Sequence, residues 1–130
     1  MPEYDSCDIL IAIAAYFPVY KRSFFKLNNP EFHSFFYEKS KEYPELFKSF
    51  NFRNDSAYFP FSGELDHART TMSFCGLLQS FGMDFNPHEF TPKCRIRFEN
   101  EVKKIFSTED LSKLEQISIE FQNKFGVEHL

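Results

Sequence analysis

The sequence predicts a mainly α-helical fold, a compact single-domain bundle of about five helices over residues 1–130. β-branched residues are scarce, with 7 Ile, 3 Val and 4 Thr, so strand formers other than aromatic residues are few. Helix start signals that pair a capping residue with proline recur along the chain. A content of 42% hydrophobic and 26% charged residues is too apolar for a disordered chain and indicates a globular domain.

The first predicted helix begins at Asp5 or Ser6, either of which can cap it, and continues through the apolar residues 9–17. Pro18 then ends or kinks it, because its ring removes a backbone donor. A buried strand is the alternative, since a continuous apolar run has no period that separates the two. The run is too short to cross a bilayer and follows acidic residues, so we expect a cytoplasmic protein without membrane association.

The second predicted helix begins at Asn29-Pro30-Glu31, which combines a capping side chain, a proline suited to the first turn and an acid at the positive helix end. One face of this helix carries aromatic rings, at Phe32, Phe35, Phe36 and Tyr43. A short turn near Pro44 then directs three apolar residues inward, namely Leu46, Phe47 and Phe50. Phenylalanines alternate on both sides of the polar residues 53–56. This pattern favours one short aromatic β-hairpin around 48–61, which the helical bundle can contain or lack.

The longest predicted helix begins after Ser62 and ends at Gly82, a usual position for a left-handed residue. Its apolar stripe is wide, comprising Leu65, Ala68, Met72, Phe74, Cys75, Leu77, Leu78 and Phe81. So wide a stripe predicts burial between several neighbours, at the centre of the fold. Asn86-Pro87 predicts a single helical turn after it.

Two further helices complete the prediction. The first starts at Thr91-Pro92 and carries a stripe of Cys94, Phe98, Val102 and Ile105, with charge pairs on its outer face. The second starts at a capping box that begins at Ser107 and continues to Gly126. Its apolar face consists of Leu111, Leu114, Ser118, Phe121 and Phe125.

Phenylalanine is unusually frequent, with 19 copies and no Trp, and 16 of the 25 aromatic residues lie in positions 16–61. Five phenylalanines on predicted helix faces are expected in the core: Phe74, Phe81, Phe98, Phe121 and Phe125. The aromatic residues of 16–61 exceed what their helix stripes require, so we expect part of them on a protein-binding surface. The candidate contact residues are Tyr20, Phe24, Phe25, Phe36, Tyr58 and Phe59.

The expected function is a small protein-binding module, acting as an inhibitor, immunity factor, antitoxin or assembly subunit. A net charge of −4 favours a basic partner, and the sequence is also compatible with a homodimer. One alternative is a carrier or sensor of an apolar small molecule, with the rings lining a pocket. Another is a nucleic-acid-binding regulator that uses the basic face of 92–106, although acidic residues share that face.

Patterns for metal, nucleotide or catalytic chemistry are weak, so we expect neither a cofactor nor an enzyme. Glu64 and His67 have the Glu-x-x-His spacing of di-iron bundles, but such sites need a second motif and two more glutamates. Cys75, His88 and Cys94 match no zinc-binding spacing. An odd count of 3 Cys without a CxxC pair predicts free thiols, and the scattered glycines form no phosphate-binding loop.

Overall fold

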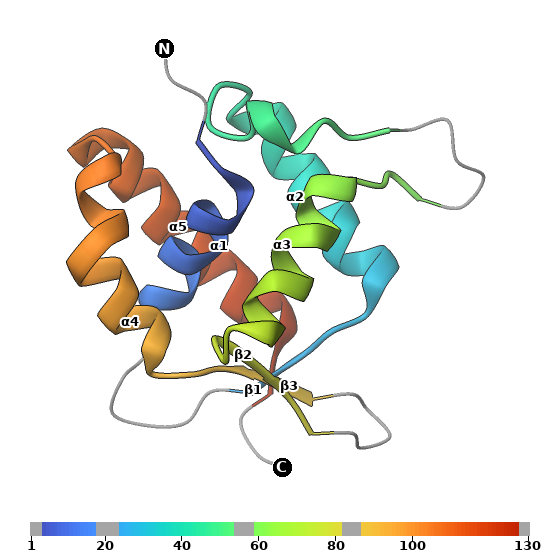
Figure 1. Ribbon diagram of the computed structural model, residues 1–130. Helices are drawn as coiled ribbons and strands as arrows, with labels where there is room; N and C mark the ends of the chain where they lie inside the picture. Colours follow the sequence, from blue (N-terminus) through green and yellow to red (C-terminus); the bar gives the residue numbers. More distant parts are fainter. Residues whose placement is uncertain (1–3, 18–23, 54–58, 82–86, 128–130) are drawn as a thin grey trace.

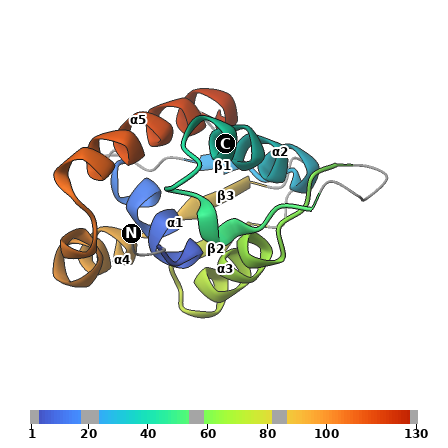
Figure 2. The same cartoon turned by 90° about the horizontal axis from the view of Figure 1, so that it is seen from above.

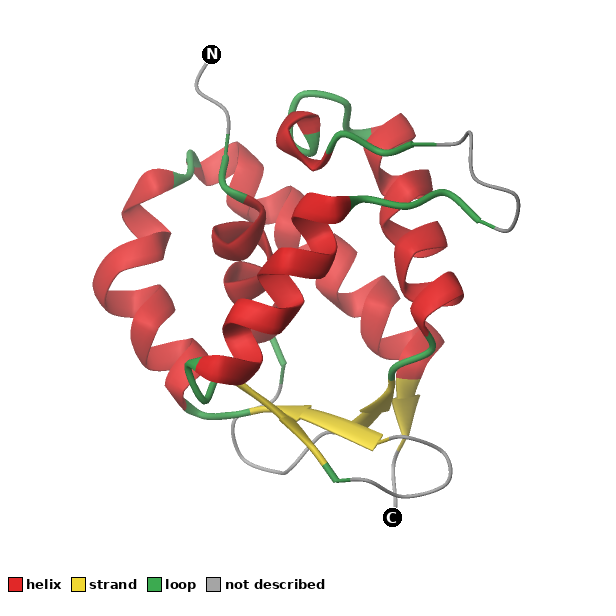
Figure 3. Cartoon of the chain, turned by 45° about the vertical axis from the view of Figure 1, so that its right-hand side comes forward, coloured by secondary structure: helices red, strands yellow, loops and turns green. Residues whose placement is uncertain are grey.

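The computed structural model describes residues 4–17, 24–53, 59–81 and 87–127 and has the predicted mainly α-helical architecture (Figure 1). Five α-helices pack together: α1 (Ser6–Ala15), α2 (Asn29–Glu42), α3 (Gly63–Phe74), α4 (Lys93–Arg97) and α5 (Thr108–Phe125). A small antiparallel sheet, which the sequence did not predict, closes one end of the bundle (Figures 1 and 3). Its strands are β1 (Phe24–Lys26), β2 (Leu78–Ser80), β3 (Pro87–Phe90) and β4 (Gly126–Val127), in the order β2-β3-β1-β4.

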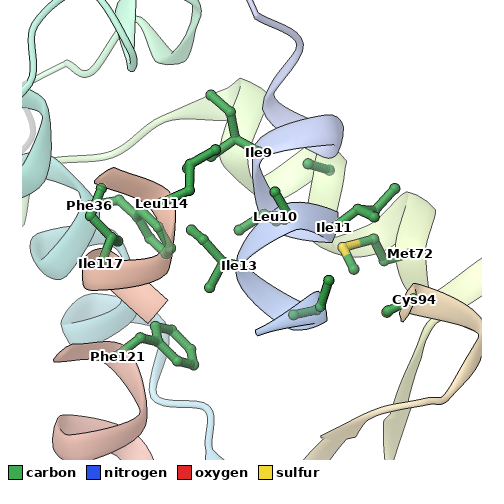
Figure 4. Packing of buried hydrophobic residues seen from close by; sticks show 14 of the residues in the cluster. Ile9, Leu10, Ile11, Ile13, Phe36, Met72, Cys94, Leu114, Ile117 and Phe121 are labelled. Carbon is green, nitrogen blue, oxygen red and sulfur yellow. The ribbon is translucent and has the colours of Figure 1, made fainter. Parts of the chain in front are cut away.

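Helix α1 is the centre of the fold, a place that the sequence predicted for the helix after Ser62. Asp5 caps α1 by accepting a 2.7 Å hydrogen bond from the Cys7 backbone N–H. Residues 9–15 are only 0–5% exposed, because α3, α4 and α5 surround the helix (Figure 2). Ile11 lies beside Met72 and Cys94, while Ile13 faces α5 (Figure 4). The segment is helical, so the strand interpretation is wrong.

Helix α2 begins at Asn29, the predicted capping residue, so its cap lies one residue earlier than predicted. Asn28 caps it by accepting from the Glu31 N–H at 3.2 Å, and Pro30 occupies the first turn, where a missing N–H costs nothing. Its rings pack inward, and the following turn and 3₁₀ helix (Lys48–Phe50) bury three apolar residues as predicted: Leu46, Phe47 and Phe50.

The aromatic hairpin is reduced, in the described residues, to a single antiparallel bridge. The Arg53 backbone N–H donates to the Phe61 carbonyl at 2.7 Å, and the Arg53 carbonyl accepts from the Phe61 N–H at 2.9 Å. No strand flanks this bridge in residues 48–53 or 59–61, and residues 54–58 lie outside the described chain. The neighbouring rings pack on α2 instead, as in the 5.6 Å contact between Tyr37 and Phe52.

Helix α3 starts as predicted but ends at Phe74, well before the predicted end at Gly82. Ser62 caps it by accepting from the Leu65 N–H at 3.0 Å. Gly76 has a φ of +76°, a left-handed conformation that glycine adopts without strain and that turns the chain out of the helix. Residues 78–80 then pair with β3, so the second half of the predicted helix is a strand; Gly82 lies outside the described residues.

Strand β3 occupies the place of the predicted turn at Asn86-Pro87. Pro87 opens this strand, Phe25 pairs with His88, and Leu78 pairs with Phe90. Asn86 itself lies outside the described residues. The sheet forms although its strands are poor in β-branched residues, because partners distant in sequence supply the backbone hydrogen bonds.

The helix predicted after Pro92 forms as three successive segments, α4, a π-helical segment (Phe98–Val102) and a 3₁₀ turn (Lys103–Ile105). Two predicted charge pairs are present, Arg97–Glu101 at 3.0 Å and Lys103–Glu99 at 3.7 Å. Cys94, Phe98 and Val102 are buried as predicted, but Ile105 is exposed. The wider π turn shifts the helical phase, which moves Ile105 out of the buried stripe.

Helix α5 forms as predicted from its capping residue to Gly126. The Ser107 hydroxyl accepts from the Asp110 N–H at 3.1 Å. Four members of its predicted face are buried, Leu114, Ser118, Phe121 and Phe125, whereas Leu111 is half-buried.

Phe121 on α5 is the hub of the aromatic core. Its ring lies within about 6.5 Å of seven other aromatic rings, several in edge-to-face geometry. These neighbours are Phe17, Phe25, Phe32, Phe35, Phe36, Phe90 and Phe125. Five of the seven come from the segment 16–61, so much of the aromatic excess is core packing.

Candidate protein-binding surfaces

The contact residues predicted from the sequence do not form one surface. Phe25 and Phe36 are 1% and 0% exposed, so the expectation that these rings contact a partner is wrong. β1 and α2 turn both rings toward Phe121. Phe24 and Phe59 are half-buried, the first in a 5.3 Å ring contact with Phe81. Tyr20 and Tyr58 lie outside the described residues.

Phe74 is the most exposed large apolar residue in the described chain, with 87% of its surface open to solvent. The sequence placed it in the core. Helix α3 buries a stripe of Leu65, Ala68 and Met72, and Phe74 follows Met72 by two residues, about 200° around the helix axis. If the predicted helix is ended at the Cys75-Gly76 turn, its apolar stripe no longer includes Phe74. The sequence then predicts an exposed ring at this position.

One cationic side chain lies beside Phe74, and a second reaches the turn that follows it. Its ring lines a shallow hollow with Arg69, Thr70 and Ser73, all on α3. A Cβ atom built on Gly76 would lie 3.3 Å from Lys93 Nζ, so this ammonium reaches the turn that follows Phe74. We call this set, Arg69, Thr70, Ser73, Phe74 and Lys93, the Phe74 surface. One helical turn beyond Lys93, Ile96 is a second exposed apolar residue, with 60% of its surface open to solvent.

A second hollow, of about 230 Å³, lies between the end of α2 and the first turns of α5. Eight residues line it, and we call it the tyrosine hollow: Tyr4, Glu42, Tyr43, Pro44, Glu45, Leu46, Asp110 and Lys113. The Tyr4 hydroxyl donates to Asp110 Oδ2 at 2.6 Å, and its ring packs on Phe106 at 4.5 Å. The bond to Asp110 raises the pKa of Tyr4, so the hydroxyl stays protonated.

The tyrosine hollow is acidic as well as aromatic. Three carboxylates line it against one ammonium, that of Lys113, which lies 3.6 Å from Asp110. Glu42 is paired outside the hollow with the buried Lys39 at 2.7 Å. Glu45 is exposed and has no ion pair among the described residues. The hollow therefore offers apolar surfaces with a negative rim.

Glu64 and His67 line a third hollow, between the N-terminal turns of α1 and α3. Glu64 accepts a 3.2 Å hydrogen bond from Asn51, and no group of three His, Cys, Asp or Glu side chains in the described chain is placed to hold a metal. Cys7 also lines this hollow, but burial and then Asp5 raise the pKa of its thiol to about 11. A thiol that stays protonated at neutral pH is a poor nucleophile.

The other two cysteines divide between core and surface. Cys94 is buried, its thiol donates to the Leu77 carbonyl at 3.2 Å, and burial raises its pKa to about 12. Cys75 is exposed, so its predicted place in the apolar stripe is wrong: α3 ends at Phe74, and Cys75 is the residue after it. All three thiols are free.

Comparison with protein-family models, curated proteins and solved structures finds no match to this chain. Among the described helices, none has the length and apolar character needed to cross a membrane.

Proposed function

We propose that this protein is a protein-binding module whose contact surface centres on Phe74. The 87% exposure of this ring carries the proposal. Leaving a phenylalanine in water forgoes roughly 1.5 to 3 kcal/mol of burial free energy, and this chain buries most of its other described phenylalanines. Aromatic side chains are enriched at the centres of protein interfaces, where they supply large contact areas at little cost in side-chain entropy.

The charges beside Phe74 indicate the chemistry of the partner surface. Arg69 is held by Asp66 at 3.0 Å, and Lys93 extends over the turn at Gly76. Two cations beside an exposed ring favour an apolar pocket with carboxylates at its rim. The net charge of −4 favours a basic partner at long range, whereas the local charges at Phe74 favour an acidic contact. An inhibitor, immunity factor, antitoxin or assembly subunit could each bind in this way.

Affinity capture with the wild-type protein and the Phe74→Ala variant tests the proposal. We expect Phe74→Ala to lose the captured partner by at least about tenfold, as for a residue at the centre of an interface. Ile119→Ala is the matched control, because Ile119 is an exposed apolar residue on a different helix, α5. If Phe74→Ala retains the same proteins as the wild type, the proposed surface is wrong.

Chemical denaturation must accompany the capture experiment, to separate loss of binding from loss of fold. Phe74→Ala should change the free energy of unfolding by no more than about 0.5 kcal/mol, as for a surface substitution. Phe36→Ala, which removes a fully buried ring, should cost roughly 3 to 5 kcal/mol. The two variants compare the contribution of a surface ring and of a core ring to the free energy of unfolding of the same protein.

A further inference from the structure

We infer that the Phe74 surface of one molecule binds the tyrosine hollow of a second copy of this chain. The inference rests on the proposed function and names a partner for its contact surface. Both halves of the contact are present in the described residues: an exposed ring beside Arg69 and followed by a turn that Lys93 reaches, and a hollow with apolar walls and an acidic rim. The local charges of the two surfaces are opposite in sign, although each copy carries a net charge of −4.

The apolar match is between one projecting ring and four receiving side chains. Tyr4, Tyr43, Pro44 and Leu46 contribute ring faces and aliphatic surface to a hollow of about 230 Å³. Aromatic side chains bury roughly 150 to 250 Å² each and pack edge-to-face or offset on other rings. Phe74 inserted there would gain the contacts that it lacks in a single molecule.

The charges match in the same orientation. Arg69, which is paired with Asp66 at 3.0 Å, lies beside Phe74, and Lys93 reaches the turn that follows it, while Glu42, Glu45 and Asp110 border the hollow. The hollow lies between the C-terminal end of α2, whose dipole adds negative potential, and the N-terminal turns of α5, whose dipole adds positive potential, so its negative rim depends on the carboxylates. Its one cation, Lys113, faces both Glu109 at 3.7 Å and Asp110 at 3.6 Å, so acidic groups of its own helix offset its charge. An incoming cation therefore meets a net negative rim.

The two surfaces lie at opposite ends of the molecule. The C-terminal end of α3 adjoins the sheet, whereas the end of α2 and the start of α5 lie at the other end (Figures 1 and 3). One contact leaves a free Phe74 surface on one molecule and a free hollow on the other. Association consequently continues head to tail rather than stopping at a pair, because this contact is heterologous.

Sedimentation velocity on the full chain tests the inference. The weight-average mass of the wild type should rise with concentration between about 10 μM and about 1 mM, the range of a weak contact. Phe74→Glu removes the ring, and Glu45→Arg reverses the charge and fills the hollow. Each variant alone should associate at least about tenfold more weakly than the wild type. Glu31→Arg makes the same charge change at the opposite end of α2 and should associate like the wild type.

Mixing the two variants gives the decisive result. Phe74→Glu keeps an intact hollow and Glu45→Arg keeps an intact Phe74 surface, so an equimolar mixture should form a heterodimer that cannot extend. Unchanged circular dichroism and urea midpoints show that each variant is folded. A monomeric wild type throughout this range, wild-type association in either variant, or a monomeric mixture would overturn the inference.

The outcomes also separate this inference from the proposed function. A monomeric wild type that still captures another protein through Phe74 overturns the self-association alone. A Phe74→Glu variant that both associates and captures other proteins like the wild type overturns both proposals.

Discussion

His33 shows how one buried side chain joins separate parts of the chain. It is fully buried, its Nδ1 accepts a 3.1 Å hydrogen bond from the Ser62 N–H, and its Nε2 has no hydrogen-bond partner among the described residues. The ring stacks on Phe61 at 4.7 Å. Because Nδ1 accepts, the neutral ring carries its proton on Nε2. Ser62 in turn donates to the Phe50 carbonyl, so α2, the 3₁₀ turn and the start of α3 meet at this histidine.

The burial of His33 predicts a loss of stability in acid. Burial lowers its pKa below the usual value of about 6.5; Asp66 opposes the shift and Arg69 reinforces it. The folded state therefore binds this proton less readily than the unfolded state, and its stability falls as the pH drops below 6.5. Urea titrations should show that the wild type loses its advantage over His33→Asn below this pH. A constant difference down to about pH 5 would contradict the prediction.

Gly76 decides where α3 ends, and with it the exposure of Phe74. The residue has a left-handed φ of +76°, which permits the turn from helix into β2. The Thr91 hydroxyl donates to the Gly76 carbonyl at 2.7 Å, which ties this turn to the residue after β3. The helix end and the sheet therefore depend on the same short turn.

Gly76→Ala should destabilise the protein by roughly 1 to 2 kcal/mol, because a Cβ atom is strained at positive φ. Gly63→Ala is the matched control, because Gly63 is the first residue of α3 and Gly76 lies just after its end. Nothing lies within 4 Å of a Cβ at Gly63, so alanine should be neutral or stabilise by up to about 1 kcal/mol. Urea midpoints of the two variants measure the difference. Equal midpoints would show that the turn tolerates a side chain.

At the scale of the whole molecule, α1 holds the other helices together. It is surrounded by α3, α4 and α5 (Figure 2), and side chains of α5 satisfy the carbonyl groups at its end. The Ser118 hydroxyl donates to the Ile13 carbonyl at 2.7 Å, and Gln122 donates to the Tyr16 carbonyl at 3.4 Å. A buried helix end needs such partners, since its last carbonyls have none within the helix.

The central position of α1 predicts that its amides exchange with solvent only through global unfolding. Native-state hydrogen exchange should give residues 10–15 an opening free energy equal to the global value. Amides of α4, whose outer face is exposed, should open at lower cost. Faster exchange in α1 than in α4 would show that α1 is not the centre of stability.

The sequence predicted the features that depend on neighbours in the chain. The caps at Asp5, Ser62 and Ser107 and the face of α5 formed as expected, because a capping bond joins residues only two or three positions apart. The predicted aromatic contact surface was wrong for Phe25 and Phe36. Both rings are buried against Phe121, which is distant in sequence. The site at Phe74 was missed because an apolar stripe does not reveal where its helix stops.

By itself, the sequence determined the helical class, most helix starts and the abundance of rings available for packing. Only the tertiary structure decided which rings are buried, that residues 78–80 leave the helix for a sheet, and that α1 lies at the centre. The physical reason is the range of the interactions. Caps and helix stripes depend on residues close in sequence, whereas strand pairing and ring burial need partners that the fold brings together. Among the described residues, Phe74 finds no such partners and stays exposed to solvent.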